Sequence, residues 1–157
     1  MDYKVTTYSE EETINLAQNI ESEKFPNMVI CLQGDLGSGK TVFTKGFARA
    51  MEIEEEVTSP TFNIIKEYTS GEIPLYHMDV YRLDGKLGDL DIEEYYTKKG
   101  VTIIEWSDMI EQYLPNNRLD IKIKISSEDE DKRIIIITPH GKKYEELCEA
   151  VLWEFYI

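Results

Sequence analysis

The sequence predicts an α/β fold of three layers, with a mixed central sheet that contains two antiparallel hairpins. Short apolar runs typical of strands buried on both faces, at residues 28–32 and 101–104, alternate with segments of helical periodicity. Alternating strand patterns joined by polar turns predict the two hairpins. At 157 residues the chain has the usual size of one domain, so we expect a single domain over residues 1–157.

The composition limits the kind of protein and its partners. Hydrophobic residues make up 41% of the chain and charged residues 31%, as in an ordinary water-soluble protein. No apolar run approaches the roughly 20 residues needed to cross a bilayer, so we expect a cytoplasmic protein with no membrane partner. The net charge of −14 opposes non-specific binding to nucleic acid, and any contact with RNA should be local or indirect. Cys31 and Cys148 have no metal-like spacing and are expected to be buried thiols.

The first helix has a clear start in the sequence. Ser9 followed by Glu12 forms a capping box, in which each side chain satisfies a backbone N–H of the first turn. The apolar face that follows is formed by Thr13, Leu16, Ala17 and Ile20. We therefore expect a helix that begins after Ser9 and leads into the buried strand at residues 28–32.

A glycine-rich phosphate-binding loop follows that strand. The pattern G-x-x-x-x-G-K-[ST] is matched by Gly34, Asp35, Leu36, Gly37, Ser38, Gly39, Lys40 and Thr41. Backbone N–H groups of such a loop surround phosphate oxygens at a helix N-terminus, the lysine reaches the β- and γ-phosphates, and the hydroxyl ligates Mg²⁺. Val42 opens the apolar stripe of the next helix and completes the candidate binding set. The motif predicts a P-loop NTPase-like fold that binds a nucleotide with Mg²⁺.

The rest of the chain supplies further strands and helices. Two hairpins are expected, one from residues 62–68 and 73–80 around a Thr-Ser-Gly turn, the other from residues 119–125 and 134–137. Helical periodicity is expected at the end of residues 85–96, over residues 106–113 and over residues 144–155. The sheet should therefore contain both parallel and antiparallel strands.

Two acidic residues are candidates for catalysis. A phosphate-binding loop alone binds nucleotide, whereas hydrolysis also requires carboxylates near the metal and the attacking water. Asp79 lies near the end of the strand at residues 73–80, and Glu105 directly follows the strand at residues 101–104. Strand ends of this kind open onto the ligand crevice of an α/β sheet. We therefore assign Glu105, Asp79 and Lys40 as candidate catalytic residues.

Taken together, four motifs in this order and spacing resemble the TsaE family, bacterial ATPases required for making N6-threonylcarbamoyladenosine in tRNA. The similar segments are the P-loop, Thr58-Ser59-Pro60-Thr61-Phe62, Tyr76-His77-Met78-Asp79-Val80-Tyr81-Arg82-Leu83 and Ile104-Glu105-Trp106. They lie between Ser9 and Tyr113, and the chain beyond Leu114 carries no diagnostic motif. Ser38 stands where the family often has Ala, and Ser107-Asp108 follows Trp106 where Pro is common. Neither departure removes a chemical group that the reaction needs.

The resemblance implies a role for each motif. Thr41, Glu105 and Asp79 would hold Mg²⁺ or its waters. Thr58 and Thr61 would belong to the loop that senses the nucleotide, and Trp106 would lie near it. The cofactors would be ATP and Mg²⁺, the protein partners TsaD and TsaB, and the contact with tRNA indirect. His77 is open to a structural or a catalytic role, and Tyr81 and Arg82 to contact with nucleotide or partner.

Two other functions fit parts of the sequence. A small-molecule kinase would need an arginine-bearing lid, but residues 85–100 contain no arginine and are acidic. A nucleotide-gated binding module would bind ATP without turnover, which Glu105 argues against. A GTPase is disfavoured because no N/T-K-x-D motif follows the P-loop.

Overall fold

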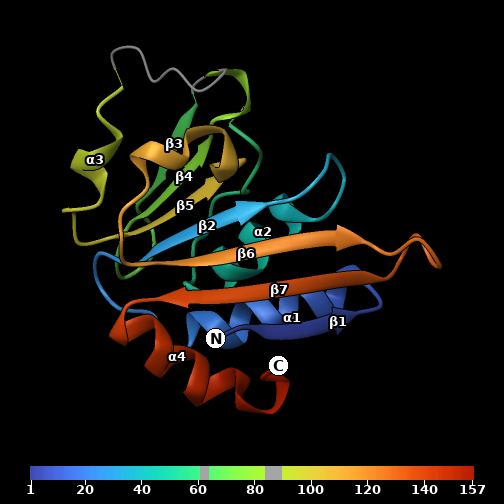
Figure 1. Cartoon of the computed structure of the whole chain (residues 1–157). Coiled ribbons are helices and arrows are strands. Elements are labelled where there is room, and N and C mark those ends of the chain that lie inside the picture. The colour runs from blue at the N-terminus through green and yellow to red at the C-terminus, as the bar shows by residue number, and fades with distance from the viewer. Residues whose placement is uncertain (61–63, 84–89) are drawn as a thin grey trace.

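A single mixed sheet of seven strands forms the centre of the computed structural model, which describes residues 1–60, 64–83 and 90–157 (Figure 1). The strands are β1 (Tyr3–Thr7), β2 (Val29–Gln33), β3 (Ile65–Tyr68), β4 (Leu75–Asp79), β5 (Val101–Glu105), β6 (Arg118–Ile125) and β7 (Arg133–His140). Their order across the sheet is β1-β7-β6-β2-β5-β4-β3. β2 pairs in parallel with β5 and β6, and β4 in parallel with β5, whereas the β3–β4, β6–β7 and β1–β7 pairs are antiparallel. The predicted mixed sheet with two hairpins is confirmed.

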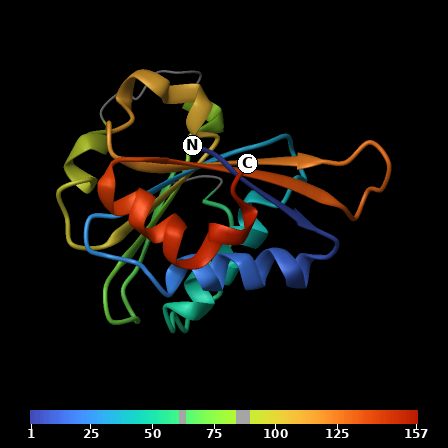
Figure 2. The ribbon, with the colours of Figure 1, turned by 60° about the horizontal axis from the view of Figure 1, so that its bottom comes forward.

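Helices cover both faces of the sheet, as Figure 2 shows. The α-helices are α1 (Glu10–Glu21), α2 (Lys40–Ala50), α3 (Ile92–Tyr95) and α4 (Lys142–Leu152), and the 3₁₀ helices are η1 (Tyr81–Leu83), η2 (Ser107–Tyr113) and η3 (Trp153–Phe155). α1, α2 and α4 lie on one face, and α3 and η2 on the other. The expected start of α1 is confirmed, because the Ser9 hydroxyl accepts a hydrogen bond of 3.2 Å from the Glu12 N–H.

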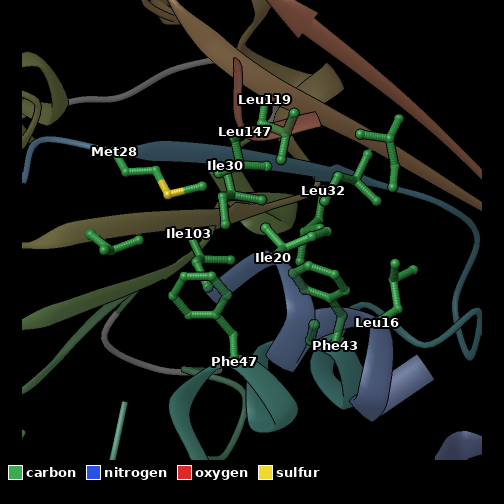
Figure 3. Close-up of a cluster of buried hydrophobic side chains, with 14 of the residues drawn as sticks. Leu16, Ile20, Met28, Ile30, Leu32, Phe43, Phe47, Ile103, Leu119 and Leu147 are labelled. Atoms are coloured by element: carbon green, nitrogen blue, oxygen red, sulfur yellow. The ribbon is translucent and has the colours of Figure 1, made fainter. Parts of the chain in front are cut away.

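The larger hydrophobic core lies between the sheet and α1, α2 and α4 (Figure 3). Ile30 and Leu32 of β2 point into it beside Phe43 and Phe47 of α2. The intervening Val29 and Cys31 belong to a second cluster on the opposite face. Successive strand residues point to opposite faces, so β2 needs an unbroken apolar run because both of its faces are covered. This burial holds the start of the P-loop on a rigid strand.

The N-terminal strand β1 is absent from the sequence-based expectations. Tyr3, Val5 and Thr7 are buried, and β1 pairs along its length with β7. The alternation of buried and less buried residues in β1 covers only five residues. The segment forms a strand because it pairs with β7, more than a hundred residues away in the chain. Long-range pairing of this kind leaves little signal in a local pattern.

Two other expectations need correction. Residues 106–113 carry a helical stripe, but the chain forms the 3₁₀ helix η2 with a break at Ile110, whose φ of −133° and ψ of 38° are not helical. The first strand after the P-loop helix begins at Ile65 among the described residues, and its partner begins at Leu75 instead of residue 73. Pro74 has no N–H to donate to a ladder, and β4 begins directly after it.

No helix in the described parts of the chain combines the length and the apolar character that crossing a bilayer requires.

Both thiols are inaccessible in the folded chain. Cys31 and Cys148 are 0% exposed, and burial raises the pKa of both thiols, that of Cys148 to about 12. Since the thiolate is the reactive form, we expect no reaction of the native protein with a thiol-specific chromogenic disulfide at neutral pH. In denaturant both thiols should react fully. Stoichiometric labelling of the native protein would contradict the buried positions of these residues.

Candidate functional site

Three strand ends meet at one edge of the sheet. In the parallel ladders Leu32 of β2 is opposite Glu105 of β5, and Glu105 is opposite Asp79 of β4. The P-loop leaves β2 one residue later and enters α2 at Lys40. The pairing therefore brings the two acidic residues predicted from the sequence next to the predicted phosphate-binding loop.

Two glycines allow the backbone path of this loop. Gly34 has a φ of 153°, and a Cβ at this position would lie 2.5 Å from the Ile123 carbonyl oxygen. Gly39 has a φ of 115° and is the N-cap of α2, with no side-chain cap on the first turn. Side chains with a Cβ rarely adopt such φ values. The first turn of α2 therefore presents uncapped backbone N–H groups at a positive helix end, which suits a bound phosphate.

The Lys40 side chain folds back over the loop. Its Nζ donates hydrogen bonds to the carbonyl oxygens of Gly34 at 2.6 Å and of Asp35 at 3.0 Å, and lies 3.9 Å from the centre of the Trp106 ring. Burial lowers the pKa of this ammonium, and the charges of Glu105 and Asp79 oppose that shift. The positive charge is thus held in the loop by backbone oxygens and by an aromatic face.

A buried polar chain links the P-loop to the sheet. The Thr41 hydroxyl donates to Glu105, 2.9 Å from Oε1 and 3.3 Å from Oε2, and Glu105 Oε2 is also hydrogen-bonded to His77 Nε2. Glu105 is 2% exposed and His77 is 0% exposed. Because a hydroxyl that donates its proton keeps its lone pairs, Thr41 Oγ1 stays free to ligate a cation while it is oriented by Glu105.

Asp79 connects the cleft to two neighbouring segments. Its Oδ2 accepts a 3.1 Å hydrogen bond from the Ser59 hydroxyl, and its Oδ1 accepts one of 3.0 Å from the Tyr81 N–H. The Tyr81 ring lies 4.5 Å from the Trp106 ring, centre to centre. Trp106 has a φ of 64°, a left-handed conformation that turns the chain sharply from β5 into η2 and brings the indole over Lys40.

These groups surround a cleft of about 460 Å³. Most of the predicted site residues line it, namely Leu36, Gly37, Gly39, Lys40, Thr41, Val42, Asp79, Glu105 and Trp106. Gly34, Asp35 and Ser38 form the loop behind them. Thr58 is not among the residues that line the cleft. It is exposed, and its hydroxyl accepts a hydrogen bond from Lys66. Thr61 lies outside the described residues, and the roles of Thr58 and Thr61 stay predictions.

Three residues near the cleft are absent from the predicted set. Glu10 at the start of α1 and Ser59 line the cleft, and Arg133 of β7 donates to the P-loop backbone. Ser59 lies in the motif Thr58-Ser59-Pro60-Thr61-Phe62, so the sequence identifies its segment although not this residue. Glu10 and Arg133 reach the loop only through tertiary packing, and no spacing rule connects them with residues 34–41.

A second hollow lies at the other end of the sheet. It measures about 410 Å³, and its walls include Phe25, Tyr96 and Tyr144. Its lining contains Lys142 and Lys143, but none of the described residues that line it is acidic and none belongs to the P-loop. The cleft beside Lys40 is therefore the one of the two in which a phosphate-binding loop and carboxylates meet.

The oxygen donors in the cleft suit a nucleotide-bound Mg²⁺. Among the described residues, no three His, Cys, Asp or Glu side chains gather to form an all-protein metal site. Mg²⁺ is normally held by one or two carboxylates or hydroxyls together with phosphate oxygens and waters. Thr41 and Glu105 supply that kind of set, with Asp79 on the neighbouring strand. The residues therefore fit a metal that arrives with the phosphates.

Known proteins resemble this chain over most of its length. The family model described as "Threonylcarbamoyl adenosine biosynthesis protein TsaE" matches residues 7–135. A tRNA threonylcarbamoyladenosine biosynthesis protein TsaE of Bacillus subtilis is 49% identical over 148 residues, which cover 94% of this chain and 92% of the relative. The protein of the same description from a Nostoc species is 37% identical over 141 residues, or 87% of this chain and 85% of the relative.

A solved structure agrees with these sequence matches. The crystal structure of Bacillus subtilis YdiB superposes with a TM-score of 0.82 at 42% identity, covering 98% of this chain and 96% of that one. The similarity therefore extends across the whole sheet and includes the β6–β7 hairpin and α4, which lie beyond the motif-bearing part of the sequence.

The buried His77–Glu105 pair gives a stability test. Replacing His77 with Leu leaves the Glu105 carboxylate buried with one partner fewer, so we expect the free energy of unfolding to fall by about 3 kcal/mol. The double variant His77→Leu/Glu105→Leu should regain part of this loss. Urea titration of the nucleotide-free proteins measures both values.

The chain has a matched control in its other histidine. His140 Nε2 contacts Asp120 at 2.8 Å, but the His140 side chain is 37% exposed. His140→Leu should cost less than about 1 kcal/mol, because solvent screens an exposed pair. If His77→Leu costs no more than His140→Leu, the pair does not stabilise the site.

Proposed function

The chain belongs to the TsaE family, and from this membership and the geometry of the cleft we propose that it is a Mg²⁺-dependent ATPase in the making of N6-threonylcarbamoyladenosine in tRNA. One observation carries the proposal. The Thr41 hydroxyl of the P-loop is hydrogen-bonded to Glu105 at the end of the adjacent parallel strand. This is the arrangement in which a phosphate-binding loop and a carboxylate act on the same metal-bound nucleotide.

Binding would use the loop and its lysine. The N–H groups at the start of α2 receive phosphate oxygens, and Lys40 can exchange its hydrogen bonds to the Gly34 and Asp35 oxygens for bonds to the β- and γ-phosphates. The exchange would add little further desolvation, because Lys40 is already only 5% exposed. Mg²⁺, held by Thr41 and Glu105, would neutralise charge on the phosphate oxygens.

Hydrolysis would depend on the two carboxylates. Glu105 orients the Thr41 hydroxyl and, with Asp79 on the next strand, places negative charge where a nucleophilic water must be held and polarised. His77 fixes the Glu105 carboxylate from the sheet side. We assign His77 a positioning role, because it is fully buried behind Glu105 and does not line the cleft.

The nucleotide state would be transmitted through Asp79. Its carboxylate holds Ser59 on one side and the Tyr81 N–H on the other, so movement of Asp79 on nucleotide exchange moves both segments. Hydrolysis would thereby reset the loop that contains Thr58 and Ser59. We propose that TsaD and TsaB, the partners implied by the family, read this change and that the chain contacts tRNA only through them. The net charge of −14 supports an indirect contact.

The central test is phosphate release from ATP. The purified chain should hydrolyse ATP slowly alone and faster with its TsaB and TsaD counterparts and tRNA. Glu105→Ala should lower the turnover by at least about 100-fold, since it removes the main carboxylate of the cleft. Lys40→Ala should abolish binding and modification together, because the positive charge facing the phosphates is lost.

The outcomes separate the alternatives. If the Glu105→Ala variant does not hydrolyse ATP yet supports normal tRNA modification, the chain is better described as a nucleotide-gated binding module. A phosphorylated metabolite formed from ATP and a substrate mixture would favour a small-molecule kinase. Modification retained by Lys40→Ala would exclude any role for nucleotide at this loop.

Trp106 offers a direct reporter of binding. It packs against Lys40 and Tyr81 in the cleft, whereas Trp153, the other tryptophan, is 71% exposed on η3. In a Trp153→Phe variant, ADP with Mg²⁺ should therefore change the intensity or wavelength of the tryptophan emission, because Lys40 leaves the ring as it turns to the phosphates. Lys40→Ala in the same background should show no change. An emission insensitive to saturating nucleotide would mean that the indole does not sense the site.

A further inference from the structure

Arg133 holds the outer side of the P-loop from a distant strand. It is the first residue of β7, and its Nε donates a 2.8 Å hydrogen bond to the Ser38 carbonyl oxygen. Its Nη2 lies 3.4 Å from the Gly37 carbonyl oxygen. Nη1 donates to the carbonyl oxygens of Glu130 and Lys132, within the β6–β7 turn. One guanidinium therefore joins the tip of the hairpin to the loop.

The two carbonyl groups that Arg133 engages control the direction of the next N–H groups. In a trans peptide the C=O and the N–H point in opposite directions. Fixing the Ser38 oxygen toward Arg133 therefore turns the Gly39 N–H to the opposite side of the loop, where a phosphate would lie. Fixing the Gly37 oxygen likewise turns the Ser38 N–H inward, and this group closes the turn with a 3.0 Å bond to Asp35 O.

Two positively charged side chains therefore donate hydrogen bonds to the backbone of the loop, and they do so from different sides. Lys40 holds the carbonyl oxygens of Gly34 and Asp35 from the cleft, and Arg133 holds those of Gly37 and Ser38 from outside it. In the described part of the chain, no other side chain donates to the Gly37 or Ser38 oxygens. Lys40 must leave its two oxygens to reach phosphates, whereas Arg133 does not line the main cleft and can keep its bonds. Arg133 lines a smaller hollow beside Gly37, Gly39 and Val42.

We propose that Arg133 is a positioning residue that keeps the P-loop in its phosphate-binding shape, in particular once Lys40 has turned to the nucleotide. The inference rests on the proposed nucleotide-binding function and deepens it. A guanidinium is suited to the task because its planar fork can donate to several carbonyl oxygens at once, which an ammonium on a flexible stem does less well.

The test is ADP–Mg²⁺ affinity measured by calorimetry on the full chain. Arg133→Ala should weaken binding roughly tenfold, because two charge-assisted hydrogen bonds that preorganise the loop are lost. Arg133→Lys should lose less, since it keeps the charge and one donor. Millimolar guanidinium should restore part of the affinity of Arg133→Ala by occupying the vacated position, and should not improve binding by the wild type.

Arg118 provides a matched control. It lies in the same hairpin and, like Arg133, donates to a backbone carbonyl oxygen, that of Pro115, as well as to Asp120 Oδ1. It is at the end of the sheet away from the P-loop. Arg118→Ala should bind ADP as the wild type does and should not respond to guanidinium. Thermal unfolding without nucleotide checks that the variants are folded. If Arg133→Ala fails to fold, Arg133→Lys carries the test.

The outcomes distinguish this inference from the proposed function. If the wild type and Arg118→Ala bind no ADP, the nucleotide-binding function itself falls. If they bind and the folded Arg133 variants bind equally well, only the positioning role is wrong. An affinity loss in Arg133→Ala that guanidinium leaves unchanged, with an equal loss of stability, would also overturn it, because the arginine would then act on the fold as a whole.

Discussion

The parallel pairing of β2 with β5 is the constraint on which the rest of the site depends. It places Leu32 opposite Glu105, so that the loop leaving β2 and the carboxylate ending β5 lie side by side. The Thr41–Glu105 hydrogen bond can form only in this register, because a shift of one residue would turn the Glu105 side chain to the other face of the sheet. The helices that bury both faces of β2 and β5 therefore hold the geometry of the candidate site.

The same constraint has an energetic cost. Glu105 at the end of β5 and His77 in the middle of β4 are buried, and Lys40 is desolvated in the neighbouring loop. Buried polar groups are destabilising unless they are hydrogen-bonded, and each of the three side chains has at least one partner that reduces this cost. If the proposed function holds, a preorganised site of this kind favours phosphate binding and electrostatic catalysis at the expense of the stability of the empty protein.

The limits of sequence-based prediction follow from the range of each signal. The P-loop, the buried strands β2 and β5 and the cap of α1 depend on neighbouring residues, so the sequence predicts them well. β1 is a strand because β7 pairs with it, and Arg133 meets Ser38 because β6 and β7 carry it there. Neither fact is encoded in a local pattern. The helical stripe at residues 106–113 predicts the correct buried face but cannot distinguish a 3₁₀ helix from an α-helix.

The site is built from two parts of the sheet, the parallel strands β2, β5 and β4 and the antiparallel hairpin β6–β7. The strands β2, β5 and β4 supply the P-loop and the two acids, while the β6–β7 hairpin supplies the arginine that touches the loop from outside. Asp79 is hydrogen-bonded to Ser59 and to the Tyr81 N–H, and Arg133 joins the P-loop to the hairpin turn. Two surface segments are therefore connected to the candidate nucleotide site by single side chains. In the proposed function, a partner that holds either segment would change the affinity for nucleotide without entering the cleft, and by linkage the nucleotide would change the affinity for that partner by the same factor.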